Sequence, residues 1–320
     1  MRVVVFLVCL LANAAFASTP LPAQESLQLL QKISAAARQV TYQGTFIFQR
    51  EGHIESTRIY HLADRSGEYE KLVRLDGPAR EIIFNGDEYQ FYYPDQKSMM
   101  AERHDVAKRG FPALLPEQLQ TLSENYQIEN DGNERLAGYE TRVLRLIPRD
   151  DFRYGHKLWI DPSTNLLLKV AMVGEDGGII EQFAFTYVKV GGSLDRNLLK
   201  PTLPVKAPML HNAPRHDAMS SGWEVDNLPS GFRKIAEMKR LFRGKSDPVT
   251  HLVYSDGIVA VSVFIEPLKS GASPMEGVAK QGAVNLYARP EDQYQITVVG
   301  EVPETTVRQI GDSVAYKGKP

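Results

Sequence analysis

The spacing of hydrophobic and polar positions changes shortly after residue 40. Residues 22–40 carry apolar side chains at helical spacing and predict a helix. Residues 41–50 instead alternate with a period of two, which is typical of a half-buried strand. The same alternation returns in short segments separated by turn residues, over residues 55–62, 68–75, 80–84 and 88–93. This part of the chain therefore predicts an antiparallel meander.

The alternation is interrupted once and then resumes. Residues 112–124 predict a second helix, whose apolar face would consist of Leu114, Leu115, Leu119 and Leu122. Further strands are expected over residues 126–129, 138–147, 155–161, 166–173 and 179–190. About ten strands in one antiparallel sheet twist and curl toward a barrel or half-barrel. We therefore expect an α+β fold that is mostly antiparallel β.

Prolines gather between residues 201 and 214, which hold four of the 19 prolines of the chain. Their density favours a semi-rigid linker over a strand or helix, with a long surface loop as the alternative. Beyond it we expect strands over residues 232–243, 251–254, 258–266, 282–287 and 294–299, and a helix over residues 303–314. The predicted organisation is a large domain over 18–200, a linker over 201–220 and a small α+β domain over 221–320.

The first 17 residues have the three regions of a secretory signal peptide. Met1-Arg2 is a short positive start, residues 3–14 are nearly all apolar, and Ala15-Phe16-Ala17 is typical of a signal-peptidase site. A buried N-terminal strand is the alternative. We predict that cleavage leaves Ser18 first and removes Cys9, the single cysteine, so that the exported chain has no disulfide.

Charge and motifs exclude several classes of function. With 37 basic and 39 acidic residues, the chain lacks the overall basicity of a nucleic-acid binder. It has no glycine-rich phosphate loop, no G-x-S-x-G elbow and no H-E-x-x-H motif. His211 and His216 lie close together, but Asp217 is the one carboxylate beside them. We predict no enzymatic activity, no cofactor and no metal site, and an exported hydrolase is the weakest hypothesis.

Aromatic residues are concentrated in the first meander, where ten of them lie between residues 42 and 93. Packing within a sheet explains such residues without any ligand. A curled sheet, however, also places one apolar face in a concavity, where an acyl chain can bind. The candidate lipid contacts on that inner face are Phe46, Phe48, Tyr89, Phe91, Trp159, Phe183 and Phe185.

A positive stripe interrupts the otherwise balanced charge at residues 232–245, where six basic residues accompany the single acid Glu237. A solvated face is one interpretation, and a surface for an acidic peptide or a lipid phosphate is the other. The candidate partner-binding residues are Arg233, Lys234, Lys239, Arg240 and Arg243. In a regular strand, alternation would place Arg233, Lys239 and Arg243 on one face and the other two on the opposite face.

Several stretches, taken together, resemble the RseB/MucB regulators of envelope stress. They are Gly67–Leu72 with Leu75–Glu81, Gly155–Asp161, Gly222-Trp223, Leu228–Phe232, the run from Tyr254 to Glu266, and Val298–Pro303. Each stretch is short, but their order and spacing are specific and span essentially the whole exported chain.

The resemblance implies a periplasmic protein of Gram-negative envelopes, whose large domain is similar to the half-open barrel of lipoprotein carriers. It implies binding to the periplasmic part of a transmembrane anti-sigma factor, which is thereby shielded from regulated proteolysis. The protein would then negatively regulate an extracytoplasmic-function sigma factor, with lipid or lipopolysaccharide as the release signal. A periplasmic lipid or lipoprotein carrier is the alternative, and a homodimer is left open.

Overall fold

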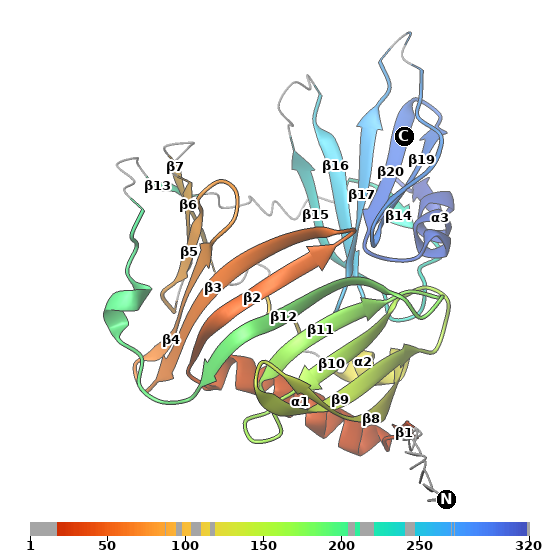
Figure 1. Cartoon of the computed structure of the whole chain (residues 1–320). Helices are drawn as coiled ribbons and strands as arrows, with labels where there is room; N and C mark the ends of the chain where they lie inside the picture. Colours follow the sequence, from red (N-terminus) through yellow and green to blue (C-terminus); the bar gives the residue numbers. More distant parts are fainter. Residues whose placement is uncertain are drawn as a thin grey trace, which may run out of the picture.

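The computed structural model describes residues 18–86, 88–93, 98–103, 110–115, 119–203, 209–211, 221–240, 247–269, 271 and 273–318. The predicted signal peptide lies outside these residues. The described chain forms sheets of thirteen, six and two strands. The helices are α1 (Ala23–Gln39), α2 (Gln120–Asn125) and α3 (Glu304–Asp312), with a 3-10 turn at Arg196–Leu199 (Figure 1). Among the described helices, none has the length and apolar character needed to cross a membrane.

The thirteen-stranded sheet has the order β1-β8-β9-β10-β11-β12-β2-β3-β4-β5-β6-β7-β13. Its strands are β1 (Thr19–Pro20), β2 (Tyr42–Arg50), β3 (His53–Asp64), β4 (Gly67–Arg74), β5 (Glu81–Phe84), β6 (Glu88–Tyr93), β7 (Ser98–Arg103), β8 (Tyr126–Leu136), β9 (Tyr139–Pro148), β10 (Gly155–Ile160), β11 (Leu167–Val173), β12 (Ile179–Val190) and β13 (Met209–His211). All described pairs are antiparallel except β7 with β13. The edge strands β1 and β13 are not neighbours, so the curled sheet does not close. The predicted half-open, mostly antiparallel architecture is confirmed.

The tight turn between β2 and β3 sets the register at the centre of this sheet. Glu51 and Gly52 both have positive φ angles, of 48° and 77°, as a two-residue hairpin with the right twist requires. The turn pairs Arg50 with His53, and pairing continues back to Tyr42 opposite His61. Directly paired residues share a face, so the inner positions of β2 and β3 are fixed by this turn.

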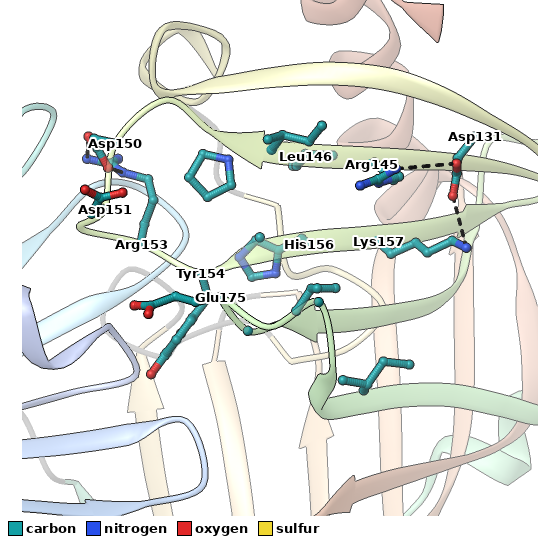
Figure 2. A pocket seen from close by; sticks show the side chains of 17 residues that line it. Asp131, Arg145, Leu146, Asp150, Asp151, Arg153, Tyr154, His156, Lys157 and Glu175 are labelled. Atoms are coloured by element: carbon teal, nitrogen blue, oxygen red, sulfur yellow. Dashed lines mark hydrogen bonds and ion pairs between the residues drawn. The ribbon is translucent and has the colours of Figure 1, made fainter. Parts of the chain in front are cut away.

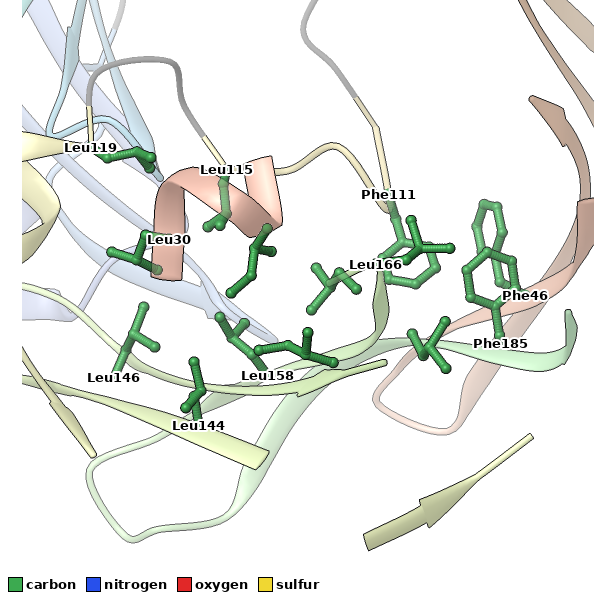
Figure 3. Close-up of a cluster of buried hydrophobic side chains, with 14 of the residues drawn as sticks. Leu30, Phe46, Phe111, Leu115, Leu119, Leu144, Leu146, Leu158, Leu166 and Phe185 are labelled. Carbon is green, nitrogen blue, oxygen red and sulfur yellow. The ribbon is translucent and has the colours of Figure 1, made fainter. Parts of the chain in front are cut away.

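The main hydrophobic core lies between the concave face of the sheet and the segments that cover it. Figure 3 shows Leu30 of α1 and Leu115 and Leu119 of the segment before α2 over the sheet leucines. The sheet contributes Leu144, Leu146 and Leu158, and Leu166 lies just before β11; all four are buried. Burial of each such side chain contributes about 1.5–3 kcal/mol, so this layer holds α1 against the sheet.

The smaller part of the chain is built on the six-stranded sheet, in the order β15-β16-β17-β20-β19-β18. Its strands are β15 (Arg233–Arg240), β16 (Val249–Ser255), β17 (Ala260–Pro267), β18 (Gly277–Gln281), β19 (Val284–Glu291) and β20 (Tyr294–Gly300). The helix α3 covers one face through Val307 and Ile310, which join a second hydrophobic core. The pair β14 (Trp223–Val225) and β21 (Val314–Tyr316) completes this small domain.

The structure differs from the expected elements in several places. Of the helix expected over residues 112–124, the described residues are helical only in α2, and Pro112 and Pro116 disfavour a continuous helix. Leu115, Leu119 and Leu122 are nevertheless buried, and Leu114 is partly buried. The strands β1, β7, β14, β18 and β21 were not predicted, and the predicted strand over 282–287 begins in the turn before β19. Within the predicted linker, β13 pairs with β7, whereas residues 204–208 and 212–220 lie outside the described residues.

Candidate functional site

A cavity of about 450 Å³ opens on the concave face of the sheet. This volume falls in the range of small-molecule sites. Its floor and walls are mostly apolar: Phe46, Phe48, Leu72, Ile82, Phe111, Leu114 and Phe183. Its rim is charged: Arg50, Glu55, Arg74, Arg80, Glu181 and Glu301. An apolar interior with a charged, arginine-containing rim suits an amphiphilic ligand.

Four of the seven predicted lipid contacts meet at this cavity. The register of β2 with β12 places Phe46 opposite Phe185 and Phe48 opposite Phe183. The ring centroids are 5.9 Å apart in the first pair and 4.6 Å apart in the second. Phe46, Phe48 and Phe183 line the cavity. Phe185 is only 2% exposed and supports the cluster from the core.

Phe111 belongs to the same cluster and was missed from the sequence. Its ring centroid lies 5.1 Å from that of Phe46 (Figure 3). It also stacks on the Phe183 ring, with the centroids 5.7 Å apart. Phe111 directly precedes the helix predicted over residues 112–124, so strand alternation could not predict its position over the sheet. The one sequence feature that pointed to Phe111 was its position as an aromatic residue beside an apolar segment.

Tyr89 and Phe91 lie on the same face of the sheet but away from this cluster. Phe91 pairs with Ile82, which lines the cavity, and Tyr89 pairs with Phe84. The rings of Phe84 and Tyr89 stack at 4.7 Å and form a separate aromatic group on β5 and β6. Neither predicted residue lines the cavity.

The predicted position of Trp159 on the inner face is wrong. Its neighbours Leu158 and Ile160 belong to the main core, so alternation turns Trp159 to the outer face. There its indole nitrogen donates to Glu134 at 2.7 Å, and the ammonium groups of Lys157 and Lys169 lie over the ring. Because these contacts cover it to 4% exposure, Trp159 is part of the outer packing of the barrel.

The cavity rim is held by an arginine that joins two carboxylates. The Arg50 guanidinium lies 2.6 Å from both Glu181, on β12, and Glu301, which follows β20 in the small domain. Burial, and then the nearby charge of Glu301, raise the pKa of Glu181 despite Arg50. Arg74, also on the rim, pairs with Glu55 at 2.6 Å.

The basic stripe maps mainly to β15, but the predicted division between its two faces is wrong. Arg233 and Lys234 pair with consecutive residues of β16, and Ile235 then forms a bulge before Ala236. Because a bulge adds one residue, the alternation shifts, and Lys234 and Lys239 share the face of Tyr254 and Thr250, while Arg233 lies on the other. The Arg240 side chain and Arg243 lie outside the described residues.

One acid within the stripe already neutralises part of it. Lys234 donates to Glu237 at 2.7 Å, and the backbone N–H of Ser221 also donates to that carboxylate. Burial alone would raise the pKa of Glu237, but these hydrogen bonds hold it below its usual value. Arg233 and Lys239 are exposed on the described strand.

A wider hollow of about 710 Å³, with several charged residues in its lining, lies at the ends of β9, β10 and β11 (Figure 2). Its charges pair with one another: Arg153 with Asp150 at 2.9 Å, and Lys157 with Asp131 at 3.1 Å. Within the described parts of the chain, no group of three or more His, Cys, Asp or Glu residues is arranged to hold a metal ion. The apolar concavity is therefore the better candidate site.

The fold and this cavity define a class of protein: a binding protein in which a half-open antiparallel barrel with an apolar concavity carries a second, smaller sheet domain. Two family models match the chain. The MucB/RseB N-terminal domain covers residues 25–203 and the MucB/RseB C-terminal domain covers residues 217–315. The chain belongs to the MucB/RseB family.

Individual relatives match over nearly their whole length. The chain is 28% identical over 293 residues to the Sigma-E factor regulatory protein RseB of Salmonella typhimurium, covering 90% of each chain. It is 30% identical over 310 residues to the Sigma factor AlgU regulatory protein MucB of Pseudomonas aeruginosa, covering 95% of each. Its structure matches that of the Pseudomonas aeruginosa MucA/MucB complex with a TM-score of 0.76 at 28% identity, covering 92% of this chain and 100% of that one.

Proposed function

We propose that this protein is a periplasmic regulator that binds the periplasmic part of a transmembrane anti-sigma factor. By shielding that factor from regulated proteolysis, it negatively regulates an envelope-stress sigma factor. The observation that carries the proposal is family membership over both parts of the chain, together with a structural match to a MucB chain in complex with MucA. Relatives that match along nearly their full length are named as sigma-factor regulators.

A protection assay tests this proposal directly. The periplasmic segment of the anti-sigma factor from the same bacterium would be incubated with its regulatory protease, with and without the purified mature chain. We expect a stable complex and slower cleavage of the segment. A segment that neither binds the chain nor is cleaved more slowly would refute the proposal.

Lipid as the release signal is supported by the cavity on the concave face. The apolar floor around Phe46, Phe48 and Phe183 suits acyl chains, and the rim arginines Arg50, Arg74 and Arg80 suit an anionic head group such as that of lipopolysaccharide. Removing one phenylalanine would cost only ~1.5–3 kcal/mol of contact, so Phe46→Ala should weaken lipid binding without abolishing it. Unchanged lipid binding by a folded Phe46→Asp variant would contradict the use of this cavity.

A lipid or lipoprotein carrier would use the same cavity, and it is the second candidate. The small domain favours the regulator, because a shuttle needs only the barrel. Affinity capture from periplasmic extract and solubilised inner membrane would separate the two. Recovery of an anti-sigma factor supports regulation, and recovery of outer-membrane lipoproteins supports transport.

Periplasmic location follows from the proposed function and from the signal-peptide pattern of residues 1–17. Cell fractionation, with N-terminal sequencing of the recovered protein, tests it. We expect the protein in the periplasmic fraction with Ser18 as its first residue. Recovery in the cytoplasm with residues 1–17 intact would overturn this part of the proposal.

A further inference from the structure

One side of the contact between the barrel and the small domain is fixed by a buried arginine. The Arg153 side chain has no solvent exposure and lies 2.9 Å from Asp256 and 2.9 Å from Asp150. It also donates to the backbone carbonyl of Ser230 at 2.5 Å. Nearby, the Thr306 hydroxyl donates to the carbonyl of Phe152 at 2.7 Å. Moving this contact would leave a buried charge unpaired, so it can serve as a pivot.

A second ion pair across the same junction is more exposed to solvent than the Arg153 contact. Arg50 reaches Glu301 at 2.6 Å, but these side chains are 27% and 43% exposed. The Gly282 N–H donates to the Glu51 carboxylate at 2.7 Å, and nearby the Asn285 side-chain amide donates to the buried hydroxyl of Tyr154 at 3.0 Å. Solvent-exposed ion pairs contribute little to stability. The Arg50–Glu301 ion pair, called the clasp below, can therefore break while the Arg153 contact persists.

A small apolar pocket of about 130 Å³ lies within this junction. Val170, Met172 and Phe183 belong to the barrel side of its lining, and Ile258 and Val259 come from the small domain. Glu181 and Glu301, the two carboxylates that pair with Arg50, also line it. Ile258 packs against both hydrophobic cores, so an occupant of the pocket touches both domains at once.

The junction pocket adjoins the cavity on the concave face. Leu114, Phe183, Glu181 and Glu301 line both. Its volume is below the range of complete small-molecule sites, so it fits one end of a longer ligand and not a whole one. An occupant that extends from the cavity into this pocket must be narrow, flexible and apolar, which is the chemistry of a hydrocarbon chain.

We propose that the junction pocket is a subsite for the end of an acyl chain, and that filling it separates Glu301 from Arg50 while the domains stay joined at Arg153. This subsite depends on the proposed lipid binding at the concave face. It explains how a lipid bound there would also contact the small domain. A ligand shifts such an equilibrium only through different affinities for the two arrangements, and an occupant wedged beside the clasp supplies that difference.

Chain-length dependence tests the subsite. Binding of palmitic acid and of decanoic acid to the full mature chain would be compared by calorimetry. Ile258→Trp fills the pocket from the small domain and Val170→Phe fills it from the barrel. Val278→Phe, on the edge strand β18, is the matched control. Each methylene excluded from an apolar site costs about fourfold in affinity. We expect the filling variants to lose more than tenfold for palmitic acid and less than twofold for decanoic acid.

Three results would overturn the subsite. First, equal palmitic acid affinity in the wild type and both folded filling variants would refute the subsite but not lipid binding at the concave face. Second, failure of the wild-type chain to bind palmitic acid would refute both the subsite and lipid binding at the concave face. Binding of the anti-sigma segment is tested separately by the protection assay. Filling variants that bind palmitic acid normally but lose the anti-sigma segment would show that a protein side chain occupies the pocket.

Domain movement is measured separately. Because the predicted mature chain has no cysteine, spin labels can be placed at Ile54→Cys and Met275→Cys, two exposed positions on the two domains. We expect palmitic acid to add a second inter-label distance in the wild type and none in Ile258→Trp. Glu301→Gln should populate that second distance without lipid. A distance distribution that palmitic acid leaves unchanged, despite binding, would refute the opening of the clasp.

Discussion

At the scale of single residues, His156 is a polar side chain that is buried among apolar ones. It lies on β10 between Leu146 of β9 and Met172 of β11, and it lines the junction pocket. Its Nε2 atom is buried without a hydrogen-bond partner among the described residues. Burial therefore lowers the pKa of His156 to about 4.

This burial predicts a pH-dependent stability. Between the usual histidine pKa and about 4, the unfolded chain binds a proton that the folded chain excludes, so stability falls as pH falls. From pH 7 to pH 5 we expect a loss of about 2 kcal/mol from this residue. His156→Phe should remove that part of the loss, as measured by urea unfolding at both pH values.

The matched control is His53→Phe, which replaces an exposed histidine on β3. Its pH dependence should follow that of the wild type. The same loss between pH 7 and pH 5 in His156→Phe as in the wild type would show that the ring is not held neutral in the folded state.

At the scale of elements, a buried ion pair fastens the segment after β12 to the outer face of the barrel. Lys71 of β4 and Glu81 of β5 are 2.9 Å apart and almost completely buried. Lys71 donates to the carbonyl of Lys200 at 2.7 Å, and the N–H of Thr202 donates to Glu81 at 2.8 Å. Burial alone would raise the pKa of Glu81, but hydrogen bonds from the Thr202 hydroxyl, the Lys71 ammonium and the Thr202 N–H lower it.

Breaking this pair on one side should destabilise the barrel strongly. Glu81→Ala leaves the Lys71 ammonium buried and unpaired, and we expect a loss of about 3–5 kcal/mol in the free energy of unfolding by urea. The double variant Lys71→Met/Glu81→Leu removes both charges and should recover most of that loss. A loss as large in the double variant as in Glu81→Ala would mean that packing, and not the unpaired charge, sets the cost.

The bulge in β15 gives a sharper test of the basic strand. Since Arg233 and Lys239 lie on opposite faces, a partner docked on one face contacts only one of them. We expect charge reversal of just one, Arg233→Glu or Lys239→Glu, to slow association with the anti-sigma segment. Association of the wild type should also slow as salt rises. Stopped-flow measurements that show no salt dependence and no effect of either reversal would leave β15 as a solvated strand.

At the scale of the whole molecule, the contact through Arg153 determines whether the two domains unfold together. Asp256→Asn keeps the side-chain oxygen that accepts from the backbone of Ile258 and Val259 but removes the charge facing Arg153. We expect a loss of about 3–5 kcal/mol. Because the lost contact spans the junction, the barrel and the small domain should then unfold in separate transitions.

The two tryptophans report on the two domains individually, since Trp159 lies in the barrel and Trp223 in the small domain. Single-tryptophan variants followed by fluorescence would show one shared urea transition in the wild-type background and two in Asp256→Asn. Asp226→Asn, which breaks an exposed pair with Lys317, should leave the shared transition unchanged. Coincident transitions in Asp256→Asn would show that other contacts couple the domains.

The elements of this fold could be predicted because their signals are local. The helix over 22–40 and the strands of the first meander follow from the period of apolar positions, and α1 and β2–β6 agree with them closely. Alternation also placed Phe46 and Phe48 on one face of β2, and Phe183 and Phe185 on one face of β12. The resemblance, carried by short stretches spread along the chain, indicated the family now shown by the two matching models.

Tertiary structure alone decided which of those faces is covered and what meets across the junction. Alternation predicts which residues share a face of a strand, but packing of α1 and Phe111 decides which face is the inner one. For this reason Trp159 was assigned to the wrong face. One bulge at Ile235 regrouped the cations of β15, because strand parity depends on pairing with β16. The contacts of Arg50 with Glu301 and of Arg153 with Asp256 join residues 251 and 103 positions apart. No local pattern encodes such pairs, since they exist only where the two sheets come together in the folded chain.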